Sequence, residues 1–397
     1  MKRIGLMGCG VVAMEAHLPV LAQIPDLKVV AVYDPNEAAA RKAAQLFGIP
    51  RHTTSQETFF KTPMDGVSIC SSAPAHYRNV LGAAAKGLPV LCEKPIAMDD
   101  HEAIAMIRAM DEAGLGFFIG FCYRFSENAQ RIRQIVQTGG IGTARLLRLQ
   151  YIWNLHGRMV PGKTRNSLVF NQRREDRMLE GGPMVDCGVH QIDLARWWLG
   201  SEVVRFEGIG QWIENYPAPD HMYLHMDHAN GAHTTIEISF SYGHTAKEPV
   251  DHFAYELVGT DGVIRYNREQ QIFEARNSQH TARYNWHGEK NFLGLYQAFS
   301  RFLHTGEAEE LPTADDGLMA TRIAREATQQ AIENRFLPQI EDTPMERLNP
   351  APDAAATPSS AAPQFSDEPT PCAPTPNVLS PWPMDRTAKD EPLPDGL

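Results

Sequence analysis

The chain has 397 residues, 43% of them hydrophobic and 21% charged, a composition typical of a folded globular protein with about two domains. Its formal net charge is −11, but ten acids and three bases lie in the last 57 residues, so the rest of the chain is only weakly acidic. Since it has no basic stripe that would neutralise a phosphate backbone, nucleic acid is excluded as the main partner.

The N-terminus runs directly into an apolar strand and lacks the long apolar core of a signal peptide. No later segment reaches the roughly 18 apolar residues that would span a membrane. The six cysteines form no CxxC pair, which argues against a disulfide framework and against a zinc module. We therefore expect a cytoplasmic protein that does not bind membranes.

From Arg3 to Cys122, short apolar runs alternate with alanine-rich amphipathic stretches. The runs expected to form strands are Arg3–Met7, Lys28–Tyr33, Gly66–Cys70, Val90–Cys92 and Phe117–Gly120. Strands that alternate with helices predict an α/β fold with a doubly wound parallel sheet. We assign residues 1–122 to this first domain.

The first strand ends in the string Gly8-Cys9-Gly10-Val11-Val12-Ala13, a GxGxxA turn that opens a helix. Gly8 permits the tight turn, Gly10 lets the backbone approach a pyrophosphate, and Ala13 allows the helix to pack closely on the sheet. The free N–H groups at the start of the helix attract the anion. An ordinary glycine turn is the alternative. The residues expected to bind a dinucleotide are Gly8, Gly10, Val11, Val12 and Ala13.

An acidic residue follows at the end of the second strand. Asp34 lies 24 residues after Gly10, where a carboxylate suits the ribose hydroxyls of a dinucleotide. Its negative charge would repel a 2′-phosphate, so NAD is favoured over NADP. Arg41 on the next helix keeps NADP as the alternative.

The tripeptide Glu93-Lys94-Pro95 follows the fourth strand. This position lies at the carboxyl edge of the sheet, where doubly wound folds bind their ligands. Lys94 is therefore expected near the reactive end of the cofactor. A surface lysine in a turn is the alternative.

The pattern changes beyond residue 122. After a helix at Asn128–Gln137, the segments that read as strands are Ala144–Asn154, Val203–Ile213, Tyr223–Asp227, Thr234–Ser241, Phe253–Val258 and Gly262–Tyr266. Strands in such close succession predict a largely antiparallel sheet. Further helices are predicted at Met184–Leu199, Asn291–His304 and Asp315–Asn334, the last with Thr313 and Asp315 as capping candidates.

We assign residues 123–340 to a second domain, which is expected to bind the substrate. Residues 341–397 are rich in Pro, Ala, Ser and Thr and show almost no periodicity. Such a segment cannot bury enough apolar surface to offset the entropy of ordering it, so a disordered tail is expected.

In the predicted helix Met184–Leu199, the residues Asp186, His190 and Asp193 have i, i+4 and i+7 spacing and share one face. Oxidation of a secondary alcohol requires a base for the hydroxyl proton, and histidine has a suitable pKa. Asp186 or Asp193 would orient its ring. Lys94, its pKa lowered by a positive nicotinamide ring, would hydrogen-bond to the same hydroxyl. A solvated helix face is the alternative.

Residues 156–180 are expected to form a loop rich in cations, namely Arg158, Lys163, Arg165, Arg173, Arg174 and Arg177. Two or three of these would suffice to bind a carboxylate or phosphate of a substrate. The alternative is a solvated loop whose cations pair with its own acids, Glu175, Asp176 and Glu180.

Four histidines surround the predicted strand at Tyr223–Asp227, namely His221, His225, His228 and His233. Their spacing alternates poorly along a strand, so no metal site is expected there. A metal on the Asp/His row of the helix is also disfavoured, because Lys94 would be an unfavourable cation beside it.

Taken in order along the chain, these motifs resemble those of the Gfo/Idh/MocA family, the glucose-fructose oxidoreductase and inositol dehydrogenase group. The resemblance covers about residues 1–340. It rests on the GxGxxA turn, Asp34, the EKP tripeptide and the segment 181–193. That segment reads Gly181-Gly182-Pro183-Met184-Val185-Asp186-Cys187-Gly188-Val189-His190-Gln191-Ile192-Asp193 and is similar to the family pattern GGxxxDxGxHxxD.

The resemblance implies a Rossmann domain followed by an α/β domain with an open, mostly antiparallel sheet. Members of the family commonly form dimers or tetramers through that sheet and mostly act on sugars, polyols and their derivatives. The resemblance further implies that Lys94 and His190 are the acid/base residues, and that Asp186 and Asp193 contact the substrate or support His190.

One stretch departs from the family pattern. The family's CTPNxxH reads Cys70-Ser71-Ser72-Ala73-Pro74-Ala75-His76 here, so Ser72 and Ala73 replace the usual Pro and Asn. The cofactor loop is therefore expected to differ in detail. The residues of these two motifs expected beside the cofactor are Ser71, Ser72, His76, Glu93 and Lys94.

We rank three functional classes. The first is an NAD-dependent dehydrogenase or reductase that acts on a secondary alcohol or ketone of a sugar, polyol or derivative. The second is a redox-neutral lyase or glycosidase that uses tightly bound NAD through a transient keto-sugar. The third is a non-catalytic nucleotide-binding sensor, which would have no need of both Lys94 and His190.

Overall fold

The computed structural model describes residues 1–153, 159–161, 168–243, 246, 248, 250–308 and 311–335. The described residues belong to one unit that ends at Arg335. The tail expected at residues 341–397 lies outside them, as do the loop cations Arg158, Lys163 and Arg165.

The first part of the chain forms a six-stranded, fully parallel sheet of order β3-β2-β1-β4-β5-β6. Its strands are β1 (Lys2–Met7), β2 (Leu27–Tyr33), β3 (His52–Thr53), β4 (Gly66–Ile69), β5 (Val90–Cys92) and β6 (Phe117–Ile119). The central strands are apolar and almost wholly buried, because helices cover both faces of the sheet. The strand order reverses between β1 and β4, the kind of point at which doubly wound folds bind ligands.

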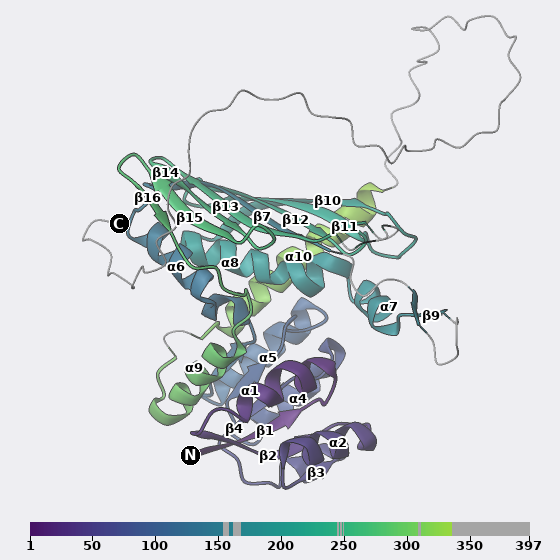
Figure 1. The fold of residues 1–397 in the computed structure, drawn as a ribbon. Coiled ribbons are helices and arrows are strands. Elements are labelled where there is room, and N and C mark those ends of the chain that lie inside the picture. Colours follow the sequence, from purple (N-terminus) through teal and green to yellow (C-terminus); the bar gives the residue numbers. More distant parts are fainter. Residues whose placement is uncertain are drawn as a thin grey trace, which may run out of the picture. The chain divides into compact units, whose positions relative to one another are not determined.

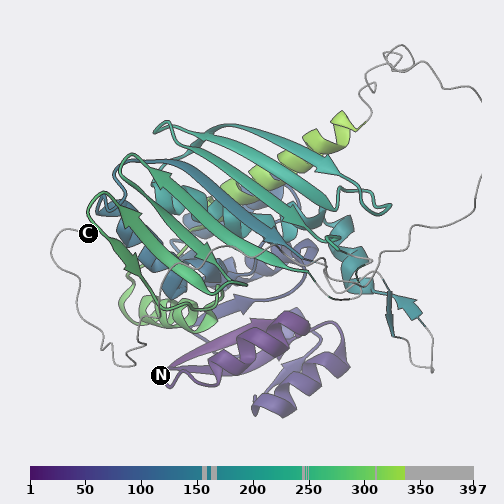
Figure 2. The ribbon, with the colours of Figure 1, turned by 45° about the horizontal axis from the view of Figure 1, so that its top comes forward.

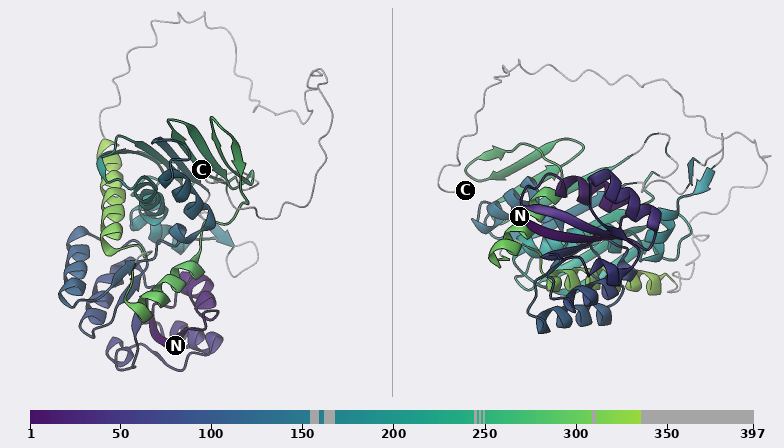
Figure 3. Two further views of the ribbon diagram at one scale, coloured as in Figure 1. Left: turned by 90° about the vertical axis from the view of Figure 1, so that its left-hand side faces the viewer. Right: turned by 90° about the horizontal axis from the view of Figure 1, so that it is seen from below.

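The helices of this part are η1 (Ala13–His17), α1 (Leu18–Leu21), α2 (Glu37–Phe47), α3 (Gln56–Phe59), η2 (Ala73–Ala75), α4 (His76–Ala84) and α5 (Asp100–Glu112). Local capping defines several starts: the Asn36 side chain accepts the first N–H groups of α2, and the Asp99 side chain does the same for α5. The helices α4 and α5 pack together, whereas α1 contacts α9 (Phe292–Thr305). Figure 3 shows the parallel sheet between these helices.

The second sheet has eight strands in the order β10-β11-β12-β7-β13-β14-β15-β16, and only β12 and β7 pair in parallel. The strands lie side by side in Figure 2. They are β7 (Ala144–Ile152), β10 (Val203–Gln211), β11 (His221–His228), β12 (His233–Ser239), β13 (His252–Gly259), β14 (Gly262–Asn267), β15 (Ile272–Asn277) and β16 (Thr281–Arg283).

Three helices cover one face of this sheet, α6 (Glu127–Gln137), α8 (Val189–Leu199) and α10 (Ala314–Asn334) (Figure 1). The close approach of α10 requires a glycine in β10, because a Cβ on Gly208 would lie 2.2 Å from the carbonyl oxygen of Ala327. The opposite face carries no helix of the described residues. None of the described helices is both long and apolar enough to cross a membrane.

The segment before α10 returns to the first sheet. The N–H of Ile119 at the end of β6 donates to the carbonyl oxygen of Pro312 over 2.9 Å, and Phe118 forms an antiparallel bridge with Thr313. Thr313 then caps α10 in a capping box with Asp316. Of the two predicted capping candidates, Thr313 is confirmed as the N-cap, whereas Asp315 lies in the first turn of the helix.

The predicted fold class is confirmed, since a parallel sheet is followed by a mostly antiparallel one. The prediction of a loop at residues 156–180 is wrong, because this segment contains β8 (Met159–Pro161), β9 (Leu168–Phe170) and α7 (Gln172–Leu179). Five of the eight residues of α7 are charged, so the helix has no apolar periodicity. It is anchored instead by two buried residues four apart, Arg174 and Met178.

The predicted helix Met184–Leu199 is divided into a π-helical turn, η4 (Met184–Gly188), and α8. The sequence analysis also missed the short strands β3, β15 and β16. These contain only two to six residues, too few for an alternating pattern to stand out. A further short helix, η3 (Cys122–Phe125), begins shortly after the end of β6.

Candidate active site

The glycine turn after β1 has the geometry expected of a pyrophosphate site. Gly8 has φ of +95°, and a Cβ there would lie 2.4 Å from the backbone nitrogen of Ser71, so only glycine fits. A Cβ on Gly10 would meet no atom within 4 Å, which leaves open space for a ligand. The following helix begins at Val11, whose side chain is 47% exposed, and Ala13 is buried against the sheet.

Asp34 is joined to this turn. Its Oδ2 accepts the N–H of Cys9 over 2.7 Å, and its Oδ1 accepts the N–H of Asn36 over 2.8 Å. The half-exposed carboxylate keeps further lone pairs for ribose hydroxyls. The open space at Gly10, the helix start and this acid together fit a dinucleotide.

The residues of the 70–76 stretch divide into two groups. Ser71 borders the pocket described below, and Ser72 is exposed. His76 is fully buried, with Nδ1 3.0 Å from the carbonyl oxygen of Pro95 and Nε2 2.9 Å from that of Ser71. This corrects the expectation that its side chain lies beside the cofactor: it joins the Ser71 loop to the EKP segment instead.

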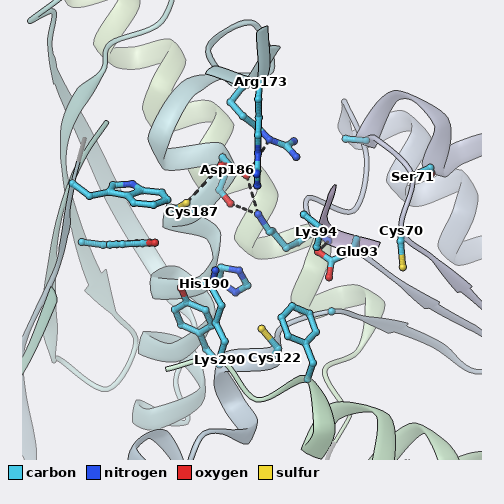
Figure 4. A pocket seen from close by; sticks show the side chains of 18 residues that line it. Cys70, Ser71, Glu93, Lys94, Cys122, Arg173, Asp186, Cys187, His190 and Lys290 are labelled. Atoms are coloured by element: carbon cyan, nitrogen blue, oxygen red, sulfur yellow. Dashed lines mark hydrogen bonds and ion pairs between the residues drawn. The ribbon is translucent and has the colours of Figure 1, made fainter. Parts of the chain in front are cut away.

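A pocket lies where the glycine turn, the ends of β5 and β6, and the start of α8 meet (Figure 4). Of the predicted site residues, Val12, Ser71, Glu93, Lys94, Asp186 and His190 line it. The other lining residues are Cys70, Ala73, Gly120, Cys122, Tyr123, Tyr151, Trp153, Arg173, Arg177, Cys187, Lys290 and Phe292.

Lys94 and Asp186 form the charged centre of the pocket. The Lys94 ammonium donates to Asp186 Oδ1 over 2.9 Å and to the Asp186 carbonyl oxygen over 2.5 Å. Burial disfavours the ammonium, but Asp186, with smaller contributions from Cys187 and Glu93, outweighs it and raises the pKa of Lys94 above its ordinary value. Lys94 is therefore a charged donor at neutral pH.

His190 lies beside this pair with its ring stacked on Tyr123, the centroids 4.2 Å apart and the planes within 4°. The side chain is buried, and its Nδ1 has no hydrogen-bond partner among the residues that the structure describes. Burial and the nearby Lys94 ammonium hold the pKa of His190 well below its ordinary value. The imidazole is therefore neutral and able to accept a proton.

Neither carboxylate on the helix is placed to orient the His190 ring, in contrast to the sequence-based expectation. Asp186 binds Lys94, and Asp193 is fully buried away from the pocket lining. The Arg124 guanidinium donates to both Asp193 oxygens, over 2.8 and 2.5 Å. Asp193 is therefore placed to hold the helix against η3 rather than to contact a substrate.

Glu93 leads from the pocket to a buried polar chain. Its Oε1 lies 2.9 Å from Nε2 of His17, and Nδ1 of His17 lies 2.7 Å from the Tyr296 hydroxyl. That hydroxyl lies 2.6 Å from Oγ of Ser68. Burial disfavours both charges. The His17 ring nevertheless lowers the pKa of Glu93 to about 2, while Cys70 and Glu93 raise the pKa of His17 to about 10. The two are therefore a buried ion pair at neutral pH.

This ion pair predicts a pH-dependent contribution to stability. Because the pKa of His17 is raised, its protonated ring stabilises the fold fully below pH 6.5, its ordinary value. This stabilisation is lost as the pH rises towards 10. The lowered pKa of Glu93 stabilises the fold above 4.5, and this is lost as the pH falls towards 2. Both contributions are complete between pH 4.5 and pH 6.5, so the free energy of unfolding lost in Glu93→Gln should be greatest near pH 5.5. It should shrink by pH 9.

Urea unfolding at pH 5.5, 7 and 9 measures this loss for Glu93→Gln, with the exposed Glu112→Gln as the matched control. A loss that stays constant from pH 5.5 to pH 9 would contradict a charged pair.

Two of the cysteines that line the pocket, Cys122 and Cys187, are neutral thiols. Burial is the main cause that raises the pKa of Cys122 to about 12, and burial followed by the Asp186 charge raises that of Cys187 to about 12. Neither is therefore a nucleophile at neutral pH. Among the described residues, no group of three or more His, Cys, Asp or Glu side chains could hold a metal ion.

The described arginines of the 156–180 segment have separate fates. Arg174 is buried and bound by the Tyr216 hydroxyl, the Phe240 carbonyl oxygen and the Glu214 carboxylate. Arg173 and Arg177 line the pocket instead. The expectation that charges in the segment pair internally holds for Arg177 and Glu180, which lie 2.5 Å apart.

The pocket residues that the sequence analysis did not identify include Tyr123, Lys290 and Trp153. Tyr123 lies in η3, in the segment that follows the carboxyl end of β6, so its place in the chain was an available signal. Lys290 lies between β16 and α9 in a segment with no recognisable motif. Its position depends on how α9 returns to the first sheet, which local patterns do not encode.

Comparison with protein families gives two adjoining matches. Residues 2–121 match an oxidoreductase family described as having an NAD-binding Rossmann fold, and residues 129–265 match the GFO/IDH/MocA C-terminal domain. The first match agrees with the glycine turn and Asp34, so this part of the chain is an NAD-binding Rossmann domain.

Two relatives named as dehydrogenases cover most of the same region. The chain is 29% identical to the D-glucoside 3-dehydrogenase of Escherichia coli (strain K12), over 60% of this chain and 70% of that protein. It is 25% identical to an inositol 2-dehydrogenase of Acidothermus cellulolyticus, over 83% of this chain and 92% of that protein.

Among solved structures, an oxidoreductase from Agrobacterium radiobacter in complex with NAD+, L-tartaric acid and magnesium superposes with a TM-score of 0.72 at 19% identity. The match covers 84% of this chain and 97% of that one. At this identity the match shows a common fold.

Proposed function

Since the chain belongs to the GFO/IDH/MocA family of oxidoreductases, we propose that it is an NAD-dependent dehydrogenase or reductase. Its substrate would be a secondary alcohol, or the corresponding ketone, of a sugar, polyol or derivative. The observation that carries the proposal is the pairing of a charged Lys94 with a neutral, unpartnered His190 in one pocket beside the NAD turn. The proposed catalytic residues are Lys94 and His190, with Asp186 as the residue that positions Lys94.

The two groups have complementary tasks in this proposal. Bound NAD supplies the acceptor for the hydride of the alcohol carbon. Neutral His190 takes the hydroxyl proton, and the Lys94 ammonium donates a hydrogen bond to the same oxygen as negative charge develops there. Asp186 fixes the ammonium through its 2.9 Å contact. In the reverse direction, the imidazolium returns the proton to the reduced oxygen.

For the cofactor, we propose that the backbone of Gly8 and Gly10 and the helix start at Val11, Val12 and Ala13 bind the pyrophosphate. Asp34 would bind the ribose hydroxyls, and its charge would favour NAD over NADP. Ser71, Ser72 and Glu93 would border the nicotinamide half.

The test is to mix the purified protein with NAD or NADP and a panel of sugars, polyols and their acid and phosphate derivatives. The absorbance of the reduced nicotinamide is followed for the native protein and for His190→Asn. We expect NAD to be reduced faster than NADP with at least one substrate, and the substitution to remove most of this rate. Binding of NAD without reduction by any member would contradict net dehydrogenation. It would favour the redox-neutral lyase or the sensor.

We further propose the domain division 1–122, 123–340 and 341–397. The family matches meet between residues 121 and 129, which supports the first boundary.

We propose assembly into a homodimer or homotetramer through the face of the eight-stranded sheet that carries no described helix. That sheet bears exposed apolar side chains such as Leu146, Tyr223 and Val258.

We also propose a cytoplasmic location, which accords with the five described cysteines, all of them free thiols.

A further inference from the structure

The helix α7 presents two arginines to the active-site pocket. Arg173 and Arg177 are four residues apart, so they project from the same face of the helix, and both line the pocket. Like charges at this spacing disfavour a helix, unless a negative group lies between or beside them. Figure 4 shows Arg173 reaching over the pocket near Asp186.

The charges that line the pocket do not balance. Four cations line it, Lys94, Arg173, Arg177 and Lys290, against the carboxylates of Glu93 and Asp186. Both carboxylates already have cationic partners, since Glu93 binds His17 and Asp186 binds Lys94.

Arg177 also has partners, since its Nη1 lies 2.5 Å from Oε2 of Glu180 and its Nε lies 3.6 Å from Oδ1 of Asp186. Among the residues that the structure describes, neither Arg173 nor Lys290 makes an ion pair. Lys290 lies close enough to His190 to help lower the pKa of its ring. The pocket therefore has an excess of positive charge on both sides of the Lys94–Asp186 pair.

The cofactor does not supply the missing negative charge. Of the pyrophosphate site proposed above, only Val12 at the helix start lines the pocket, whereas Gly8 and Gly10 of the turn do not. The oxidised nicotinamide ring carries a positive charge and would increase the imbalance. A guanidinium that is half-buried and without a carboxylate partner is suited to bind two oxygens of a carboxylate or phosphate.

We infer that the substrate of this pocket is an anionic sugar or polyol derivative whose carboxylate or phosphate binds Arg173. Arg177 and Lys290 add to the positive potential that attracts it. This inference rests on the proposed function and specifies its substrate class. A neutral sugar would leave the guanidinium of Arg173 without a partner, so it would be bound more weakly than its acidic counterpart.

The experiment compares matched pairs with NAD: a hexuronate and its parent aldose, an aldonate and the corresponding alditol, and a sugar phosphate and the free sugar. The proteins are the native chain, Arg173→Gln and Arg108→Gln, the last an exposed arginine on α5 away from the pocket. Circular dichroism and thermal unfolding check that each variant is folded. Which pair responds distinguishes a carboxylate from a phosphate.

We expect kcat/KM to be about tenfold or more higher for the anionic member of at least one pair, as for a charge-assisted hydrogen bond. Arg173→Gln should remove this preference, mainly by raising KM for the anionic member, whereas Arg108→Gln should keep the native preference. Equal or better turnover of every neutral member would overturn the inference while the dehydrogenase function stands. A rise of KM for NAD alone in Arg173→Gln would also overturn it, since the residue would then serve the cofactor.

If no member of the panel reduces NAD, the proposed function fails for that panel and calorimetry decides the inference. The same pairs are titrated into the native protein and Arg173→Gln with NADH bound. Stronger binding of an anionic member that Arg173→Gln abolishes would support the inference. Binding of neither member, or of both equally, would overturn it.

Discussion

Replacing Lys94 by methionine should lower kcat by about 10²- to 10⁴-fold, the range typical of a positioned proton donor or acceptor. Methionine keeps much of the length of the side chain but removes the ammonium that donates to Asp186. The developing negative charge on the substrate oxygen then loses its donor, whereas the NAD turn at Gly8 and Gly10 is untouched. We therefore expect KM for NAD to change little while kcat collapses.

Steady-state kinetics with the best substrate of the panel measures both constants. The matched control is Lys86→Met, an exposed lysine just beyond α4, which should behave as the native protein. A kcat within tenfold of the native value would show that Lys94 is not the donor to the reacting oxygen. His190 and a bound water would then have to account for the chemistry.

Asp193→Asn should lower the free energy of unfolding by about 3 kcal/mol, as expected when one partner of a buried ion pair is removed. The Arg124 guanidinium binds both oxygens of Asp193 and is itself buried, so its charge would lose its closest partner. Asp316, 3.1 Å from Arg124, would compensate for only part of this loss. The urea midpoint measures the effect.

Asp186→Asn is the informative comparison. Asp186 is also an aspartate, lies one turn before His190 and contacts Lys94. Its substitution should lower kcat, because the ammonium is no longer held in place. Asp193→Asn should remain active below its unfolding transition. The exposed Asp111→Asn on α5 controls for the loss of a charge. If Asp193→Asn kept the stability of the native protein but lost turnover, Asp193 would have a role in catalysis rather than in stability.

The two acids also illustrate which parts of the site were predictable. Their spacing relative to His190 placed them on one helical segment, which the structure divides into η4 and α8. The spacing could not distinguish the acid that reaches the pocket from the one that does not. The π-helical turn Met184–Gly188 departs from the regular 100° per residue on which that reading depended. The partner of Asp193, Arg124, lies 69 residues away in sequence, beyond the reach of any local pattern.

By contrast, the NAD turn was readable because its parts are contiguous or separated by a single strand and helix. The N–H of Cys9, between Gly8 and Gly10, donates to the Asp34 carboxylate, and these residues meet because β1 pairs with β2 in the βαβ unit. The helix α7 was not readable, since its burial depends on one arginine, Arg174, that looks solvent-exposed by residue type. Motifs that lie within one supersecondary unit were therefore recovered, and contacts between distant units were not.

The return of the chain to the first sheet affects the order in which the protein can mature. Phe118 and Ile119 at the end of β6 bond to Pro312 and Thr313, almost two hundred residues later. During synthesis the NAD-binding half emerges first, yet β6 remains an open edge, able to pair with another chain, until that segment leaves the ribosome. The two halves are thus a single unit of biogenesis, and a truncation before Pro312 would leave an aggregation-prone edge.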